Sequence, residues 1–229
     1  MLRIVRGALL SLALILTASE AVAETRIGGV VQRDYTGAIG VRAGQGESER
    51  LFYDHDVFAE QRIKTDRDAN TRLQFLDSTE LTVGGNSNVL LDRFIFDPDS
   101  GAGEAALTFG KGVFRFVTGK IKTKEAVTLK TPTATIAIRG THLILTVRYD
   151  GSAAVAVVEG AILVQACGSA SALEASAGST VEIAPVCAPP TRREGYEIPN
   201  EFQDSRSRDK QGGDNGGKQS GSNRGGKGP

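Results

Sequence analysis

The densest group of residues able to do chemistry is Asp54-His55-Asp56, because carboxylates and an imidazole together can bind a divalent metal ion. If the three residues lie in a strand, Asp54 and Asp56 share one face and His55 takes the other. A metal site needs more ligands that converge on one point, and His142, the other histidine, is far along the chain. The sequence therefore predicts no metal site.

Acidic residues are the remaining candidates for catalysis, as the carboxylate pair of a glycosidase: Asp77, Glu80, Asp92 and Glu159. They stand at expected turn positions, where acidic residues are common for reasons of backbone geometry. No G-x-S-x-G, H-E-x-x-H or Walker-type motif occurs, and no Ser-His-Asp or Cys-His arrangement is indicated. We predict that the protein is not an enzyme and uses no cofactor.

Residues 131–141, T-P-T-A-T-I-A-I-R-G-T, are the stretch around which we expect the fold to be organised. Thr and Ile favour extended backbone, and Gly140 permits a bend that a side chain would resist. We predict a kink at Arg139-Gly140-Thr141 between two strands. Arg139 falls on the face opposite the two isoleucines, where it either pairs with a neighbouring acid or carbonyl, or binds a planar carboxylate or phosphate. Arg139 and Thr141 are thus the candidate binding residues.

The chain has two cysteines, Cys167 and Cys187. The strand-like residues 161–166 precede the first, and the strand-like residues 180–186 precede the second. If these segments pair antiparallel, the two sulfur atoms meet, and a disulfide there stabilises the fold by about 3 kcal/mol in the chain-entropy model. An oxidising compartment favours the disulfide, and two free buried thiols are the alternative.

The elements that must position these residues are strands. From residue 51 onward, short segments of alternating apolar and polar residues recur about every ten residues, with polar turns between them. We predict an all-β fold of mainly antiparallel short strands in a two-layer sandwich or roll, and the spacing leaves a barrel open. Residues 24–50 hold weaker lead-in strands, and residues 51–190 form the main β domain.

Both ends of the chain differ from this pattern. Residues 1–23 resemble a secretory signal peptide, with Arg3 and Arg6 before an apolar run and Ala21-Val22-Ala23 at its end. We predict cleavage after Ala23 and a periplasmic mature chain without a membrane span, and an uncleaved anchor is the alternative. Residues 191–229 are rich in Gly, Lys, Arg, Asn and Ser, so we predict a disordered tail.

The overall charge of the chain gives no indication of a nucleic-acid partner, and we predict none. Lys+Arg and Asp+Glu both number 27, so no global positive charge indicates nucleic acid. Carbohydrate binding is a weaker prediction than protein binding, since Trp is absent and the four tyrosines are scattered: Tyr35, Tyr53, Tyr149 and Tyr196.

The stretch at 131–141, followed by a strand, the turn Asp150-Gly151 and V-x-E-G at 157–160, resembles the FecR domain of bacterial envelope proteins. The resemblance extends over residues 51–160, with a looser fit to residue 183. It implies a periplasmic domain that relays a signal from an outer-membrane receptor to a cytoplasmic sigma factor. Residues 1–6 alone precede the apolar run, too few to hold a sigma factor, so we expect no direct sigma-factor contact.

The function predicted from these observations is that of a non-catalytic exported FecR-like domain, a protein-interaction, signalling or scaffold module of the cell envelope. Its expected partner is an envelope protein, and an exposed sheet edge that accepts a partner strand is one way to bind it. The alternative is a carbohydrate- or cell-wall-binding module with a glycan as ligand. An enzyme ranks last.

Overall fold

The computed structural model describes residues 24–34, 37–42, 48–123, 126–167, 169–199 and 202. The predicted signal peptide, residues 1–23, lies outside this part of the chain, as do residues 203–229 of the predicted tail. The described part is all-β, as predicted. Within it, no helix has the length and apolar character that crossing a membrane requires.

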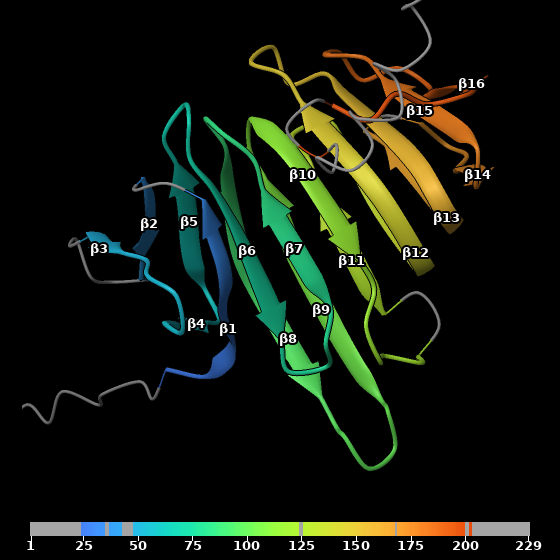
Figure 1. Ribbon diagram of the computed structural model, residues 1–229. Helices are drawn as coiled ribbons and strands as arrows, with labels where there is room; N and C mark the ends of the chain where they lie inside the picture. Colours follow the sequence, from blue (N-terminus) through green and yellow to red (C-terminus); the bar gives the residue numbers. More distant parts are fainter. Residues whose placement is uncertain are drawn as a thin grey trace, which may run out of the picture.

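The strands are numbered in chain order (Figure 1). The first eight are β1 (Arg26–Asp34), β2 (Ala38–Val41), β3 (Ser48–Arg50), β4 (Asp56–Phe58), β5 (Gln61–Thr65), β6 (Asn70–Phe75), β7 (Glu80–Val83) and β8 (Asn88–Phe96). The second eight are β9 (Gly103–Phe109), β10 (Gly112–Val117), β11 (Val127–Lys130), β12 (Ala134–Val147), β13 (Ala153–Ala166), β14 (Leu173–Ser176), β15 (Ser179–Ile183) and β16 (Thr191–Glu194).

These strands form one hydrogen-bonded sheet that folds over into two layers. The first layer runs β3, β2, β5, β8, β9, β11, then the start of β12, the end of β13, and β14. The second layer runs β4, β1, β6, β7, β10, then the end of β12, the start of β13, β15 and β16. Neighbouring strands are antiparallel except β9 and β11. The prediction of a mainly antiparallel two-layer fold is confirmed.

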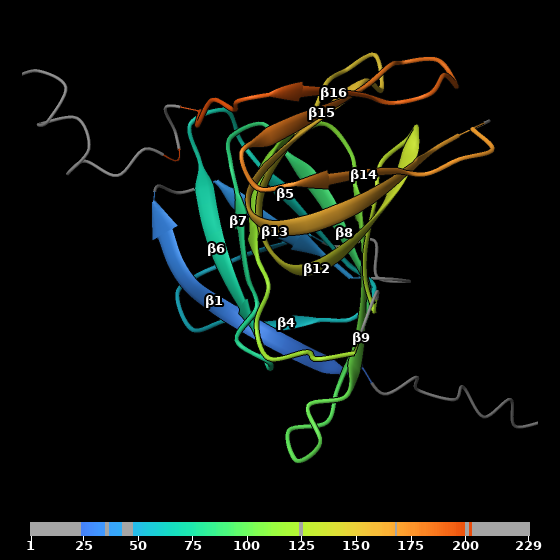
Figure 2. The same ribbon diagram turned by 90° about the vertical axis from the view of Figure 1, so that its right-hand side faces the viewer.

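Two long strands belong to both layers because each bends in its middle. Residues 135–138 of β12 pair with β11, whereas residues 142–147 pair with β10. Gly140 in β12 and Gly160 in β13 have φ of +55° and +80°, and the register between the strands shifts after Arg139. Figure 2 shows both strands curving from one layer to the other. The predicted kink lies at this bend, although the backbone continues as one strand through it.

A single hydrophobic core lies between the layers. Alternate residues point inward along each strand, so that Leu73 and Phe75 of β6 are buried while Gln74 is exposed. Aromatic pairs join the layers directly. The ring centroids of Phe109 and Phe114 are 4.7 Å apart, on β9 of the first layer and β10 of the second.

The layers are also linked at the end opposite the bend. The Thr133 hydroxyl, just before β12, donates a hydrogen bond of 2.9 Å to the carbonyl of Gly151, in the turn after β12. Cys167 follows β13 in the first layer, and Cys187 follows β15 in the second. The two cysteines form a disulfide, with their Cα atoms 4.8 Å apart. A covalent bond therefore joins the two layers where no strand connects them.

Two details of the predicted organisation are wrong. Residues 161–164 pair with β14, whereas β15 pairs with residues 153–157, so the segments before the two cysteines are not paired with each other. The bend places the two halves of β13 in different layers, which gives each half a different neighbour. Strand β16 also lies within the predicted tail, so the folded part continues past residue 190.

Candidate functional site

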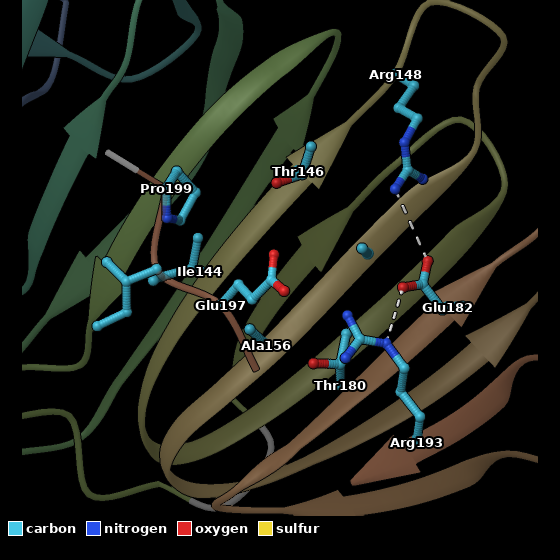
Figure 3. A pocket seen from close by; sticks show the side chains of 11 residues that line it. Ile144, Thr146, Arg148, Ala156, Thr180, Glu182, Arg193, Glu197 and Pro199 are labelled. Carbon is cyan, nitrogen blue, oxygen red and sulfur yellow. Dashed lines mark hydrogen bonds and ion pairs between the residues drawn. The ribbon is translucent and has the colours of Figure 1, made fainter. Parts of the chain in front are cut away.

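A segment of the chain folds back over the outer face of the second layer. After β16, Gly195 has φ of +83°, which favours glycine, and the chain turns back over the sheet. We call residues 195–199 the strap. Figure 3 shows its residues Glu197 and Pro199 near Ile144 and Ala156, which belong to β12 and β13.

Three hydrogen bonds hold the start of the strap. The N–H of Gly195 donates to the carbonyl of Gly178 at 2.7 Å. The Thr180 hydroxyl donates to the carbonyl of Gly195 at 2.7 Å, and the Arg193 guanidinium reaches the same oxygen at 3.4 Å. Because Thr180 lies on β15, these bonds tie the strap to the sheet as well as to β16.

The strap accounts for an outward side chain that is buried. Leu143 and Leu145 of β12 point into the core, so Ile144 between them points to the outer face. Ile144 is nevertheless only 3% exposed, and Ala156, its partner on β13, is 7% exposed. Ile198 and Pro199 of the strap lie against the same pocket as these two residues.

A groove of 340 Å³ remains between the strap and the sheet. Its floor is apolar and made of small or branched side chains, Ile144, Ala154 and Ala156. Its rim is polar and charged, with residues from β12, the turn after it, β15, β16 and the strap: Thr146, Arg148, Thr180, Glu182, Arg193 and Glu197. An apolar floor between charged rims suits an extended stretch of polypeptide.

Ion pairs organise one rim of the groove. Glu182 lies between two guanidinium groups, 3.9 Å from Arg148 Nη2 and 3.4 Å from Arg193 Nε (Figure 3). All three side chains are partly exposed, so these pairs add little to stability. They do fix where positive and negative charge lies along the groove.

The turn between β12 and β13 positions Arg148. The Ser152 hydroxyl donates to Asp150 at 2.7 Å and accepts a 3.3 Å hydrogen bond from Arg148 Nη1. The bonds from the Ser152 hydroxyl and backbone N–H lower the pKa of Asp150. The predicted Asp150-Gly151 turn thus connects directly to the groove rim.

The two candidate binding residues at the bend differ in their surroundings. Arg139 is exposed and forms no ion pair with any residue that the structure describes. Thr141 is buried, and its hydroxyl donates to the carbonyl of Ala161 at 2.9 Å and accepts from the N–H of Arg139 at 3.1 Å. Thr141 therefore fastens the bend. A binding role for either residue stays a prediction.

The other residues considered from the sequence do not meet at this groove. Asp54 has φ of +67° and precedes β4, so Asp54-His55-Asp56 is not one strand, contrary to the geometry considered for it. Asp56 forms an ion pair with Arg26, and His55 Nδ1 is 3.7 Å from Glu49. Among the tyrosines considered for sugar stacking, Tyr149 has Lys111 Nζ 4.4 Å from its ring centroid, which covers one face of the ring.

Comparison with known proteins identifies the domain that carries the bend. Residues 61–163 match the family model described as FecR protein. The protein contains a FecR domain. This domain runs from the start of β5 into β13, so it includes Arg139 and Thr141, whereas the strap and β14 to β16 follow it.

Two crystal structures of a putative anti-sigma factor from Parabacteroides distasonis are similar to the chain, at 13% and 12% sequence identity and a TM-score of 0.46 each. Each alignment covers 58% of this chain and 59% of the anti-sigma factor chain. A search of curated proteins found no match.

The strap groove was not predicted from the sequence, although one sequence pattern indicates that this face of the sheet is covered. Leu143-Ile144-Leu145 is a run of three large apolar residues in a strand whose other face should meet water. Such a run indicates a strand covered on both faces. The covering segment itself carries no such signal, because it lies among the polar residues of the predicted tail.

Proposed function

We propose that this FecR-domain protein is exported and acts, without catalysis, as a protein-interaction module for signalling or scaffolding in the bacterial cell envelope. Its partner is an envelope protein. The signal-like residues 1–23 support export, and so does the Cys167–Cys187 disulfide, which is typical of an oxidising compartment.

The observation that carries the proposal is the strap. The outer face of the second layer already holds an extended piece of polypeptide, anchored at Gly195 and packed over Ile144 and Ala156. The groove beside it offers a partner the part of the apolar floor that the strap leaves accessible, at Ala154, and a rim of fixed charges. The partner segment that fits is extended, with small apolar side chains toward the floor.

A site-specific photo-crosslinker in living cells tests the proposal. The photoreactive residue p-benzoylphenylalanine replaces Thr146, which lines the groove. Thr135, exposed on the same strand in the first layer, is the matched control position. We expect the probe at 146 to capture one segment of one envelope protein, located by mass spectrometry, and the probe at 135 to leave that protein uncaptured. Equal capture at both positions, or none at 146, would refute the proposal.

A further inference from the structure

A second, smaller pocket lies on the same outer face, beside the strap groove. It has a volume of 250 Å³ and is lined by Arg72, Glu80, Thr82, Arg115 and Val117. Arg115 of this pocket is the cross-strand partner of Ile144 in the groove floor, so the two sites adjoin. All of its lining residues lie within the FecR domain.

The sheet register brings two arginines to this pocket. Arg72 on β6 pairs with Thr82 on β7, and Thr82 pairs with Arg115 on β10. The three residues thus form one row on the outer face. Because neighbouring strands are about 4.8 Å apart, the two arginine Cα atoms are separated by about 10 Å. Side chains of this length can reach one group placed between them.

The positive charge of this pair is not balanced in full. Among the residues that the structure describes, neither Arg72 nor Arg115 forms an ion pair. The Nε atom of Arg72 is buried and has no hydrogen-bond partner among these described residues. A guanidinium without a carboxylate partner keeps its charge uncompensated, and an unpaired buried donor is unfavourable as well.

Arg115 is held in position by His142. The Nε–H of Arg115 donates to His142 Nε2 at 2.9 Å, which requires a neutral imidazole with its proton on Nδ1. Burial and the nearby Arg115 charge lower the pKa of His142, which favours that neutral form, while Glu159 opposes them. This bond uses the Nε–H of Arg115 and leaves its two terminal nitrogens to bind a ligand.

We propose that the Arg72–Arg115 pocket binds a single carboxylate group, supplied by an acidic side chain of the protein partner. Two guanidinium groups and the Glu80 carboxylate leave a net charge of one, which a carboxylate neutralises and a doubly charged phosphate exceeds. The planar guanidinium also matches a carboxylate with two parallel hydrogen bonds. This inference rests on the proposed function, and it adds that the partner segment carries an Asp or Glu next to its apolar residues.

Titration of the purified protein, followed by NMR of the arginine Nε–Hε resonances, tests the carboxylate site. The probe is N-acetylglutamic acid amide, which has one carboxylate. N-acetylglutamine amide is the neutral control of the same shape, and inorganic phosphate is the competing anion. We expect saturable shifts at Arg72 and Arg115 with the glutamate probe, none with the glutamine probe, and weaker binding of phosphate.

Substitutions provide the matched controls. Arg72→Gln and Arg115→Gln should each weaken binding of the glutamate probe at least tenfold, because each removes one of the two guanidinium groups. Arg93→Gln, an exposed arginine paired with Glu104 elsewhere, should leave binding unchanged. An unaltered backbone amide spectrum shows that each variant is folded. Absence of saturable shifts, equal effects of all three substitutions, or tighter binding of phosphate would overturn the inference.

The same variants separate this inference from the proposed function. If the crosslinker at 146 captures a partner equally well in wild type and in Arg115→Gln, the carboxylate site is wrong and the interaction module stands. If the glutamate probe binds as expected but no partner is captured, the interaction module is wrong, and the pocket binds carboxylates from another source.

Discussion

His142 joins the chemistry of the outer face to the stability of the fold. It accepts a hydrogen bond from Arg115 through Nε2, and it is half-buried on β12 opposite Glu159. Protonation of Nε2 would remove the acceptor and place a second positive charge beside the guanidinium. Burial, then the Arg115 charge, lowers the pKa of His142, and Glu159 raises it. The pKa of His142 therefore depends on its burial and on both neighbouring charges, those of Arg115 and Glu159.

The lowered pKa sets a pH dependence with a definite sign. The unfolded chain takes up the proton at the ordinary histidine pKa of about 6.5, and the folded protein takes it up only at lower pH. The free energy of unfolding should therefore be constant above this value with respect to His142 and decrease as the pH falls below it. Urea unfolding at pH 7.5 and pH 5.5 measures the difference.

His142→Gln is the matched variant for this measurement, since its amide oxygen can accept from Arg115 at every pH. The variant should lose less stability than wild type between the two pH values. Asp97 and Asp150 also have lowered pKa values, but they titrate below their ordinary value of 3.8 and outside this window. An identical decrease in both proteins would show that His142 does not titrate in this way.

At the scale of elements, the bend in β12 and β13 decides the architecture. Each strand contributes one half to each layer, so both layers depend on two glycines, Gly140 and Gly160. The two glycines differ in their surroundings. A Cβ atom on Gly160 would lie 2.3 Å from the carbonyl oxygen of Gly140, whereas a Cβ atom on Gly140 would meet no atom of the described part of the chain within 4 Å.

Alanine substitutions at the bend should therefore have unequal effects. Gly140→Ala places a side chain at positive φ without a clash, which costs about 1 kcal/mol. Gly160→Ala adds a backbone clash to the same strain and should cost about 3 kcal/mol, because the two strands must move apart. Urea unfolding of both variants against wild type measures the two costs. Equal losses would mean that the strands are not in close contact at Gly160.

The bend was predictable from the sequence and its consequences were not. Local preferences sufficed to locate it, because a glycine after a run of β-branched residues is the only place where that stretch turns easily. The pairing of each half with separate strands depends on contacts between distant residues. The parallel pair of β9 and β11, between strands otherwise joined antiparallel, likewise has no local sequence signal.

The candidate site, like the bend, was predictable from the sequence only in part. The exposed position of Arg139 and the burial of both isoleucines before it follow from alternation along a strand. The strap groove and the Arg72–Arg115 pocket arise because residues from the strap and from seven strands meet on one face: β6, β7, β10, β12, β13, β15 and β16. No spacing within the sequence brings these residues together, so only the folded chain reveals them.

At the scale of the whole molecule, β12 and β13 connect the two layers at the bend. At the opposite end, side chains link the layers. The disulfide between Cys167 and Cys187 provides this link, together with the hydrogen bond from Thr133 to Gly151. The N–H of Cys167 also donates to the carbonyl of Thr133 at 2.8 Å. These contacts link the end of β13, the start of β12 and the segment after β15 at one place.

Removal of the disulfide should therefore weaken both the whole fold and this end in particular. Its cysteines are 20 residues apart, so the chain-entropy model gives a loss of about 3 kcal/mol in the free energy of unfolding. The double variant Cys167→Ala/Cys187→Ala should show this loss in urea unfolding, and dithiothreitol should produce it in wild type but not in the variant. Hydrogen exchange at the amide of residue 167 should become faster, while the core strand β10 changes only with global stability. Two free thiols in the protein purified from an oxidising compartment, or an unchanged free energy of unfolding, would contradict the covalent closure of the layers.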